Sequence, residues 1–442
     1  MTTTARDALD LAFRQSYLKE VDGRLGAAVP RPLPAGPRRP LARGAWSRIA
    51  AVPYPVTGFD AVEGDPLDTV LPVALGLLRH EPHNPYNPHA AIPSARCAFA
   101  VRAYVVRGGE VLAYVPARHE LRLVGDGAPD GRHVCVVADP AAFPAGYHDL
   151  RVALALLEAG HAVANLVTAG RAAGLRSVVR AAGDELLPLL GLDPAGPVLA
   201  AAVVTFGTGG DLAPLLPGAD PAPHLPVPPG GATTPAPEPR PPAGRLADVL
   251  WRRSAGRGVP GLSASLRPVP ASALWRAAAE AARLDLVAGT EGPRGPVGWL
   301  RQFWVTERVD GVPDGVHEHV GDGIVTHRRG RFLARVQEGF SYPATQTAVE
   351  TTNLVGLFAV DYPALMRAYG PAGFLAAQLR LGAAAQAASL ALAAEGLFAR
   401  PCRSFHEHVL DDLLGLTATE TVGYELLCGR ARFPDLLLDL RM

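Results

Sequence analysis

Two alanine- and leucine-rich runs decide the fold of this 442-residue chain: DLRVALALLEAGHAVANLVTAGRAAGL at 149–175 and GFLAAQLRLGAAAQAASLALAAEGL at 373–397. Each run predicts a buried helix, and polar interruptions such as Glu158 and Gln386 argue against a membrane span. Each run ends in Gly-Leu, which suits a helix C-cap because glycine adopts the left-handed conformation there at little cost. The chain therefore repeats one helical signal in each half.

Other elements repeat around these helices in the same order. Each half has a strand, a hairpin-like segment, the long helix, a short amphipathic helix ending in Leu-Leu-Gly-Leu, and a final strand. They fall at 98–106, 108–121, 149–175, 184–192 and 199–207 in the first half, and at 301–309, 311–327, 373–397, 408–416 and 420–429 in the second. This order at similar spacing indicates a tandem duplication. The expected class is α+β, with a mixed sheet flanked by long helices in each copy.

The domain boundaries follow from composition. Residues 209–244 are rich in proline and glycine and predict a semi-rigid linker between a first domain at 46–208 and a second at 245–442. Residues 1–45 contain a Pro/Arg-rich stretch and predict an extended N-terminal arm.

Charge and cysteine usage exclude several classes of function. The 42 basic and 42 acidic residues balance, so we expect no nucleic-acid partner. The four cysteines form no CxxC pair, and neither a disulfide framework nor a metal site is indicated. The sequence opens without the apolar run of a signal peptide, so we expect a cytoplasmic protein with no membrane association.

Three segments carry a resemblance to a known family. LADVLWRRSAGRG (246–258) opens the second copy, HAAIPSARCAFAVRAYVV (89–106) lies in the first, and ARPCRSFHEHVLDDLLGL (399–416) follows the second long helix. Together they resemble the nitroreductase-like flavoproteins, and among these the azoline dehydrogenases of thiazole/oxazole-modified peptide and thiopeptide biosynthesis. The resemblance covers 46–207 and 245–442 and implies that the chain is a single-chain pseudo-dimer that binds FMN.

The resemblance implies that Arg252, Arg253 and Ser254 hold the ribityl and phosphate groups of FMN. Arginine suits this role because its planar guanidinium offers two parallel hydrogen bonds to a phosphate. The same residues could instead be a solvated arginine pair at a helix end. Near the C-terminus, Arg430 and Arg432 match basic residues that the family returns to the phosphate, although a solvated tail is the alternative.

Two further segments match positions that face the flavin ring in the family. Pro93, Ser94 and Ala95 would supply small groups and backbone donors along the isoalloxazine, and Arg96 could approach the pyrimidine edge or the substrate. In the second copy, three residues would pass the N5 edge: Cys402, Arg403 and Ser404. Arg403 departs from the family's usual glycine and could meet an anionic or peptide substrate. Since each copy keeps only one part of the pattern, we expect one FMN per chain, in the seam between the copies.

The expected proton-transfer pair is incomplete. The family often carries Lys-Tyr before the long helix, whereas the matching RAYGPAGF (367–374) keeps Tyr369 and replaces lysine with Ala368. Tyr369 is therefore one candidate base. Histidine is the alternative because it titrates near neutral pH, and the candidates are His89 and His406, with His83 and His408 beside them.

Three functions remain open from the sequence. The first is an FMN-dependent dehydrogenase that oxidises azoline rings to azoles in a ribosomally made peptide. Its expected partners are the precursor peptide, a cyclodehydratase complex and dioxygen as electron acceptor, with further homodimerisation possible. The second is an NAD(P)H-dependent nitro or quinone reductase. The third is a non-catalytic scaffold of a peptide-modifying complex.

Overall fold

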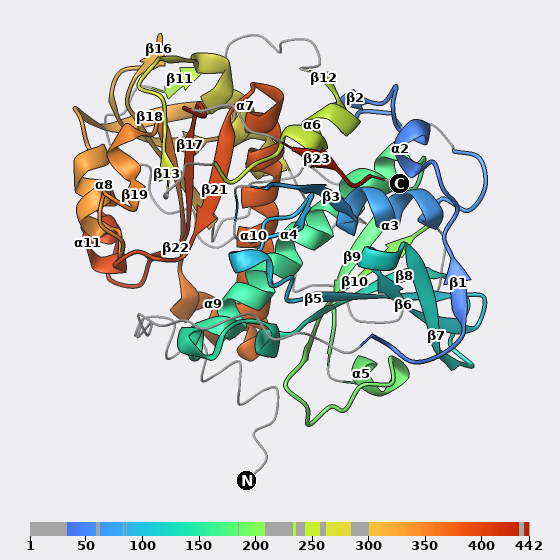
Figure 1. The fold of residues 1–442 in the computed structure, drawn as a ribbon. Coiled ribbons are helices and arrows are strands. Elements are labelled where there is room, and N and C mark those ends of the chain that lie inside the picture. Colours follow the sequence, from blue (N-terminus) through green and yellow to red (C-terminus); the bar gives the residue numbers. More distant parts are fainter. Residues whose placement is uncertain are drawn as a thin grey trace.

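The computed structural model describes residues 33–58, 62–82, 84, 86–183, 185–207, 233–235, 244–256, 262–283, 300–432 and 437–441. We call 33–207 the first half and 244–441 the second half. Figure 1 shows a sheet in each half, with the two long helices between the sheets. These helices are α4 (Leu150–Ala172) and α10 (Pro371–Ala394), and they pack against each other. The meeting region of the two halves is called the seam below.

The two large sheets have the same strand order. The first runs β1-β7-β6-β5-β8-β10-β9, and the second runs β11-β18-β17-β15-β20-β22-β21. The strands of the first sheet are β1 (Arg38–Pro40), β5 (Val101–Arg107), β6 (Glu110–Val115), β7 (Glu120–Asp126), β8 (Arg132–Ala138), β9 (Ser177–Ala181) and β10 (Leu199–Phe206). Those of the second are β11 (Thr233–Pro235), β15 (Leu300–Thr306), β17 (Gly315–Val320), β18 (Gly323–Arg329), β20 (Leu354–Val360), β21 (Phe398–Cys402) and β22 (Thr421–Gly429).

Neighbouring strands in both large sheets are antiparallel, which corrects the expectation of a mixed sheet. Short turns join several sequential strands, and such turns permit only antiparallel pairing. Among the described strands, parallel pairing occurs in two small sheets, β13 (Leu262–Ser263) with β19 (Thr347–Ala348) and β14 (Val269–Pro270) with β16 (Val309–Asp310).

The C-caps of the long helices are confirmed. Gly174 (φ 77°) follows α4 and Gly396 (φ 74°) follows α10, both in the left-handed region. The next residues fold back, because Leu175 N–H donates to Gly170 O (2.8 Å) and Leu397 N–H to Leu392 O (2.9 Å). By length and composition alone α4 could cross a membrane, but 83% of its apolar window is buried inside the protein, as expected for a core helix.

The two long helices cross at a pair of glycines. A Cβ added to Gly160 would lie 2.2 Å from the carbonyl oxygen of Leu379, and one added to Gly382 would lie 2.0 Å from that of Leu157. The helix backbones can approach this closely only because neither position carries a side chain.

The remaining described helices and small strands complete both halves. The helices are α2 (Ala45–Arg48), α3 (Leu67–Leu75), α5 (Leu186–Leu189), α6 (Leu246–Arg252), α7 (Ala271–Arg283), α8 (Leu333–Gly339), α9 (Tyr362–Tyr369) and α11 (Glu407–Leu414), with 3-10 turns η1 (Ala95–Cys97), η2 (Pro116–Arg118), η3 (Pro140–Ala142), η4 (Ala145–Tyr147) and η5 (Val349–Thr351). The small strands are β2 (Pro53–Tyr54), β3 (Leu77–His80), β4 (His89–Ala90), β12 (Gly244–Arg245) and β23 (Leu438–Asp439).

The halves exchange short strands at their boundaries. Strand β12, which begins the described second half, pairs with β2 of the first, and the C-terminal β23 pairs with β3. Strands β1 and β11 lie within the segments expected to be an arm and a linker, yet each adds an edge to a large sheet. Pairing with an existing edge orders a short segment that has little core of its own.

Candidate functional site

Arg79 of β3 joins the two halves at the candidate site. Its side chain is 1% exposed, and its partners come from both halves. Nη1 donates to the carbonyl of Trp251 and Nη2 to that of Arg253, both at 2.9 Å, while Nε donates to Glu81 Oε1 at 3.0 Å. A cation at these carbonyls stabilises the C-terminal end of α6 because the helix dipole is negative there. The first half therefore fixes the segment that carries the expected phosphate anchor.

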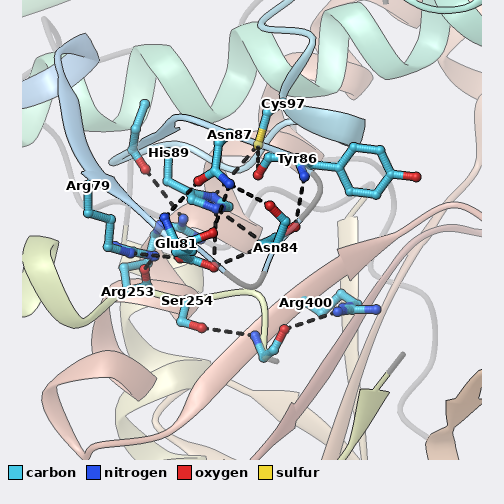
Figure 2. A network of polar contacts seen from close by, with 12 residues as sticks. Arg79, Glu81, Asn84, Tyr86, Asn87, His89, Cys97, Arg253, Ser254 and Arg400 are labelled. Atoms are coloured by element: carbon cyan, nitrogen blue, oxygen red, sulfur yellow. Dashed lines mark hydrogen bonds and ion pairs between the residues drawn. The ribbon is translucent and has the colours of Figure 1, made fainter. Parts of the chain in front are cut away.

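Glu81 also holds His89, and His89 lies beside a thiol. His89 Nε2 is 3.1 Å from Glu81 Oε2, and His89 Nδ1 is 3.7 Å from Cys97 Sγ. Figure 2 shows this row of side chains next to Arg79 and Arg253. Burial, assisted by the nearby Glu81 and Glu158 carboxylates, raises the pKa of Cys97 to about 12, so the thiol is neutral. A carboxylate beside the imidazole orients the ring by accepting a hydrogen bond from one ring nitrogen.

Two asparagines hold the loop that contains this row. Asn87 Oδ1 accepts from Glu81 N–H (2.8 Å), and Asn87 Nδ2 donates to Glu81 O (2.9 Å). Asn84 Nδ2 donates to Glu81 Oε2 (3.0 Å) and lies 3.3 Å from His89 Nε2. These hydrogen bonds fix Glu81 from both its backbone and its side chain. The imidazole is therefore held in one orientation.

The Pro-Ser turn at Pro93–Arg96 continues from this row. Ser94 Oγ accepts from Phe99 N–H at 2.8 Å and closes the turn. Arg96 (φ 56°), Cys97 (φ 53°) and Phe99 (φ 46°) all adopt the left-handed region that side chains disfavour. Each such residue costs about 1–3 kcal/mol, and strain of this kind concentrates at functional sites. Pro93, Ser94 and Ala95 are half-buried here, beside the Glu81–His89 pair.

The three residues of the expected phosphate anchor lie in different environments. Arg252 is exposed at the end of α6, whereas Arg253 is 3% exposed and points into the seam, with Nη2 3.4 Å from Ala90 O. Ser254 Oγ accepts from Gly256 N–H at 3.1 Å, and Ser254 O accepts from Ala399 N–H at 2.9 Å. The expected roles therefore separate, since Arg252 can meet solvent or a phosphate and Arg253 is an interior charge.

Arg430 and Arg432 lie beside the segment that follows Ser254. Ser265 N–H donates to Arg430 O at 2.9 Å, and Arg432 Nη1 donates to Ser263 Oγ at 3.4 Å. Arg432 is exposed and Arg430 is half-buried. Guanidinium and hydroxyl groups gathered at one end of the second sheet are the donor types that bind a phosphate. These residues fit the phosphate of FMN in their chemistry.

The segment expected at the flavin edge contains buried Arg403 between half-buried Cys402 and Ser404. Burial, followed by the Glu425 carboxylate, raises the pKa of Cys402, so it is a neutral thiol. Arg403 is 3% exposed, and its Nη1 donates to Glu407 Oε1 at 2.6 Å. The Arg403 Nε is buried and has no acceptor among the described residues, so it fits a carbonyl of a bound ring. Ser404, half-buried, accepts from Ser341 N–H through its carbonyl at 2.9 Å.

Helices α4 and α10 add a buried polar network across the seam. His161 Nδ1 is 2.9 Å from Gln386 Oε1, and His161 Nε2 is 3.1 Å from Tyr424 Oη. Gln386 Nε2 donates to Asn165 Oδ1 at 2.8 Å and to Ala91 O at 3.1 Å. Burial lowers the pKa of His161 to about 3, and the charge of Arg253 acts in the same direction. This network joins the long helices to Ala91, directly after the strand that carries His89.

The other candidate bases lie elsewhere. Tyr369 ends α9, before the N-terminal end of α10, whereas Ser254 contacts Ala399, beyond the C-terminal end. A helix of 24 residues spans about 36 Å, so Tyr369 and Ser254 lie near opposite ends of α10. His406 and its neighbour His408 are exposed at the start of α11. His83 lies outside the described residues.

Sequence reasoning selected His89 but missed the residues that hold it. Arg79, Glu81, Asn84, Asn87 and Cys97 were not assigned a role. The available signal was the polar run EPHNPYNPH (81–89) between two apolar segments, because polar residues packed so densely beside buried strands need partners.

Comparison with known proteins supports the fold. No protein-family model and no curated protein matches the sequence. A crystal structure of a candidate nitroreductase from Anabaena variabilis matches with a TM-score of 0.74 and 15% identity, over 96% of this chain and 99% of that one. The fold is nitroreductase-like. This nitroreductase-like fold includes both halves, since the match runs through nearly the whole chain.

Two shorter matches resemble part of the chain. One is a candidate nitroreductase from Ralstonia eutropha, at 17% identity over 44% of this chain and 94% of that one, with a TM-score of 0.27. The other is one chain of the microcin synthetase complex of Escherichia coli, at 20% identity over 32% of this chain and 62% of that one, with a TM-score of 0.26. Because these TM-scores are low, the fold assignment rests on the Anabaena structure.

Proposed function

We propose that this chain is an FMN-dependent dehydrogenase that oxidises azoline rings to azoles in a ribosomally made peptide. The observation that carries the proposal is the continuous polar network from Arg253 of the second half to the Glu81–His89 pair of the first. It sets a histidine with a carboxylate partner beside the segment expected to hold the cofactor. A non-catalytic scaffold would have no need of a buried, strained and charged arrangement of this kind.

FMN would be held at its phosphate by Arg252, Ser254, Arg430 and Arg432. The ring would lie against Pro93, Ser94 and Ala95 on one side and against the Cys402–Ser404 segment on the other. When bound, FMN supplies a hydride acceptor, which no protein side chain can provide. We also infer that the two halves arose by tandem duplication, supported by their shared strand order and the matched glycines of α4 and α10.

His89 would act as the base in this reaction. Converting an azoline to an azole removes one proton and one hydride, and His89 would take the proton at its imidazole. The Glu81 carboxylate stabilises the resulting imidazolium, and Asn84 keeps the ring from turning. The neutral Cys97 thiol packs beside the ring without competing for the proton. The precursor peptide and a cyclodehydratase complex are the proposed partners, and dioxygen is the proposed electron acceptor.

The test begins with the colour and FMN content of the purified full-length chain. One FMN per chain, bleached anaerobically by a synthetic thiazoline peptide, supports the proposal. The His89→Asn variant should lose about 10²- to 10⁴-fold in kcat while keeping its FMN, and His406→Asn, an exposed control, should be unchanged. A colourless protein that cannot be reconstituted with FMN would overturn the enzyme assignment.

A second candidate is an NAD(P)H-dependent nitro or quinone reductase, favoured by the likeness to a candidate nitroreductase. Such an enzyme would be reduced by the nicotinamide and would pass the electrons to a small oxidant. Anaerobic bleaching by NADPH, with no bleaching by the thiazoline peptide, would select this function. Bleaching by the peptide alone would select the dehydrogenase.

A further inference from the structure

An aromatic and cationic cluster lies beside the Glu81–His89 pair and has no part in the chemistry above. It consists of Tyr86, Arg96, Tyr147 and Tyr342, and we call it the aromatic cradle. Arg96 Cζ lies 5.5 Å from the centre of the Tyr86 ring, which is cation–π distance. Tyr86 is 41% exposed, an unusual exposure for so large an aromatic side chain beside a buried polar network.

The cradle draws on both halves. Burial raises the pKa of Tyr147, and the neighbouring Tyr342 adds to this rise, while the charge of Arg96 and its hydrogen bond to Tyr147 oppose it. Arg96 therefore reaches both Tyr86 and Tyr147 from the Pro-Ser turn. Tyr342 belongs to the exposed segment after α8 in the second half and is half-buried against Phe340, at 6.0 Å between ring centres.

The backbone ties the cradle to the candidate base. The Cys97 thiol donates to Tyr86 O at 3.5 Å, and Tyr86 N–H donates to Asn84 Oδ1 at 3.0 Å. Figure 2 shows the Tyr86 backbone at Cys97 and its ring pointing away from Glu81 and Arg79. Arg96 (φ 56°) and Cys97 (φ 53°) both have a left-handed backbone. Arg96 therefore lies at the cradle, while Cys97, the next residue, lies at His89.

We propose that the aromatic cradle binds the peptide segment that carries the reacting five-membered ring. The guanidinium of Arg96 would donate to a carbonyl oxygen next to that ring, and the tyrosine faces would pack on the ring and its flanking residues. The flat aromatic rings can stack on a heterocycle, and the guanidinium can donate hydrogen bonds to the amide carbonyls on either side of it. Because the Tyr86 side chain is exposed, a peptide would reach its ring from solvent. This inference rests on the proposed function.

The test compares two variants with a matched control. Arg96→Ala and Tyr86→Ala remove cradle groups, and Arg118→Ala removes an exposed arginine in another 3-10 turn of the first half. The probes are a synthetic peptide with one thiazoline, the same peptide with thiazole, and menadione. We expect both cradle variants to raise KM for the thiazoline peptide by about tenfold or more, with kcat within about threefold. The FMN content and the KM for menadione should stay unchanged, and Arg118→Ala should match the wild type.

Binding of the thiazole peptide, measured by titration calorimetry, separates failure of the cradle from failure of the proposed function. If the wild type binds this peptide and the cradle variants do not, the cradle stands even if the thiazoline is never oxidised. If the wild type oxidises the thiazoline peptide and the variants keep its KM, the cradle assignment is wrong. If the wild type neither binds nor oxidises these peptides, both assignments fail. Equal losses for menadione and peptide would also overturn the cradle, since they would indicate general damage to the site.

Discussion

The Arg79 guanidinium donates to the backbone carbonyl of Arg253 at 2.9 Å, although the two residues are 174 positions apart. The same guanidinium pairs with Glu81, which in turn holds His89. A single side chain therefore fixes the end of α6 and the orientation of the candidate base. Loss of Arg79 should disturb both, and the two effects can be measured separately.

We expect Arg79→Ala to lower the free energy of unfolding by about 3–5 kcal/mol, because it leaves the Glu81 carboxylate buried without its cation. Urea unfolding followed by circular dichroism measures this change. Arg335→Ala is the control, since Arg335 pairs with Glu338 at the surface (45% and 62% exposed) and such pairs contribute about 0–1 kcal/mol. Equal losses in the two variants would contradict a structural role for Arg79.

The crossing of α4 and α10 predicts that replacing glycine by alanine there changes stability in the direction opposite to the usual one. Replacing a glycine within a helix by alanine ordinarily stabilises it by about 1 kcal/mol. Gly160→Ala and Gly382→Ala should instead destabilise the protein by about 1–3 kcal/mol, because each added Cβ would meet a carbonyl oxygen of the other helix. Thermal unfolding of both variants checks this. A rise in the unfolding temperature of either one would show that the helices can separate at no cost.

His161 predicts a loss of stability in acid. Burial lowers its pKa to about 3 in the folded protein, while an unfolded histidine titrates near 6.5. The unfolded state therefore binds more protons between these values, and the free energy of unfolding falls as the pH drops from about 6.5 towards 3, by up to about 1.4 kcal/mol per pH unit.

The measurement is the change in urea midpoint between pH 7 and pH 5. The His161→Gln variant should show a smaller change than the wild type, whatever its stability at pH 7. His406→Asn serves as the exposed control and should keep the wild-type change. If the His161 variant keeps it too, another group causes the acid sensitivity.

The C-terminal tail provides a fourth prediction. Arg441 Cζ lies 4.4 Å from the ring centre of Trp251 and 5.6 Å from that of Trp46, so it contacts one tryptophan of each half. Removing this cation with Arg441→Ala should weaken docking of β23 onto β3. We expect faster hydrogen exchange at the Leu440 amide, which donates to Leu78 O at 2.8 Å, with β10 as the internal reference. Unchanged exchange at this amide would show that strand pairing alone holds the tail.

Local patterns in the sequence predicted the elements that local physics controls. The long helices begin and end within a few residues of the expected positions, because their composition and the glycines at 174 and 396 act over one or two turns. The strand order of the sheets could not be predicted without the structure. The edge strands β1 and β11 were not predicted either, because each forms only by pairing with a strand far along the chain.

In the candidate site too, some residues could be selected from the sequence, whereas their partners could not. His89 and Ser254 stand out as residue types, but their partners depend on side chains that meet only after folding. Arg253 was expected at a phosphate, and the structure buries its side chain in the seam, where it influences His161. Nothing in the local sequence distinguishes Arg253 from its exposed neighbour Arg252, because the difference comes from the contacts of Arg253 with Arg79 and Ala90 of the first half.

The cross-half contact at Arg79 has a consequence for inheritance. In a pair of identical chains, one codon change would alter two symmetry-related sites at once. Here the loop that holds His89 and the segment that carries Arg253 are each encoded once, at separate places in one gene. Selection can therefore alter one wall of the site while the other stays constant.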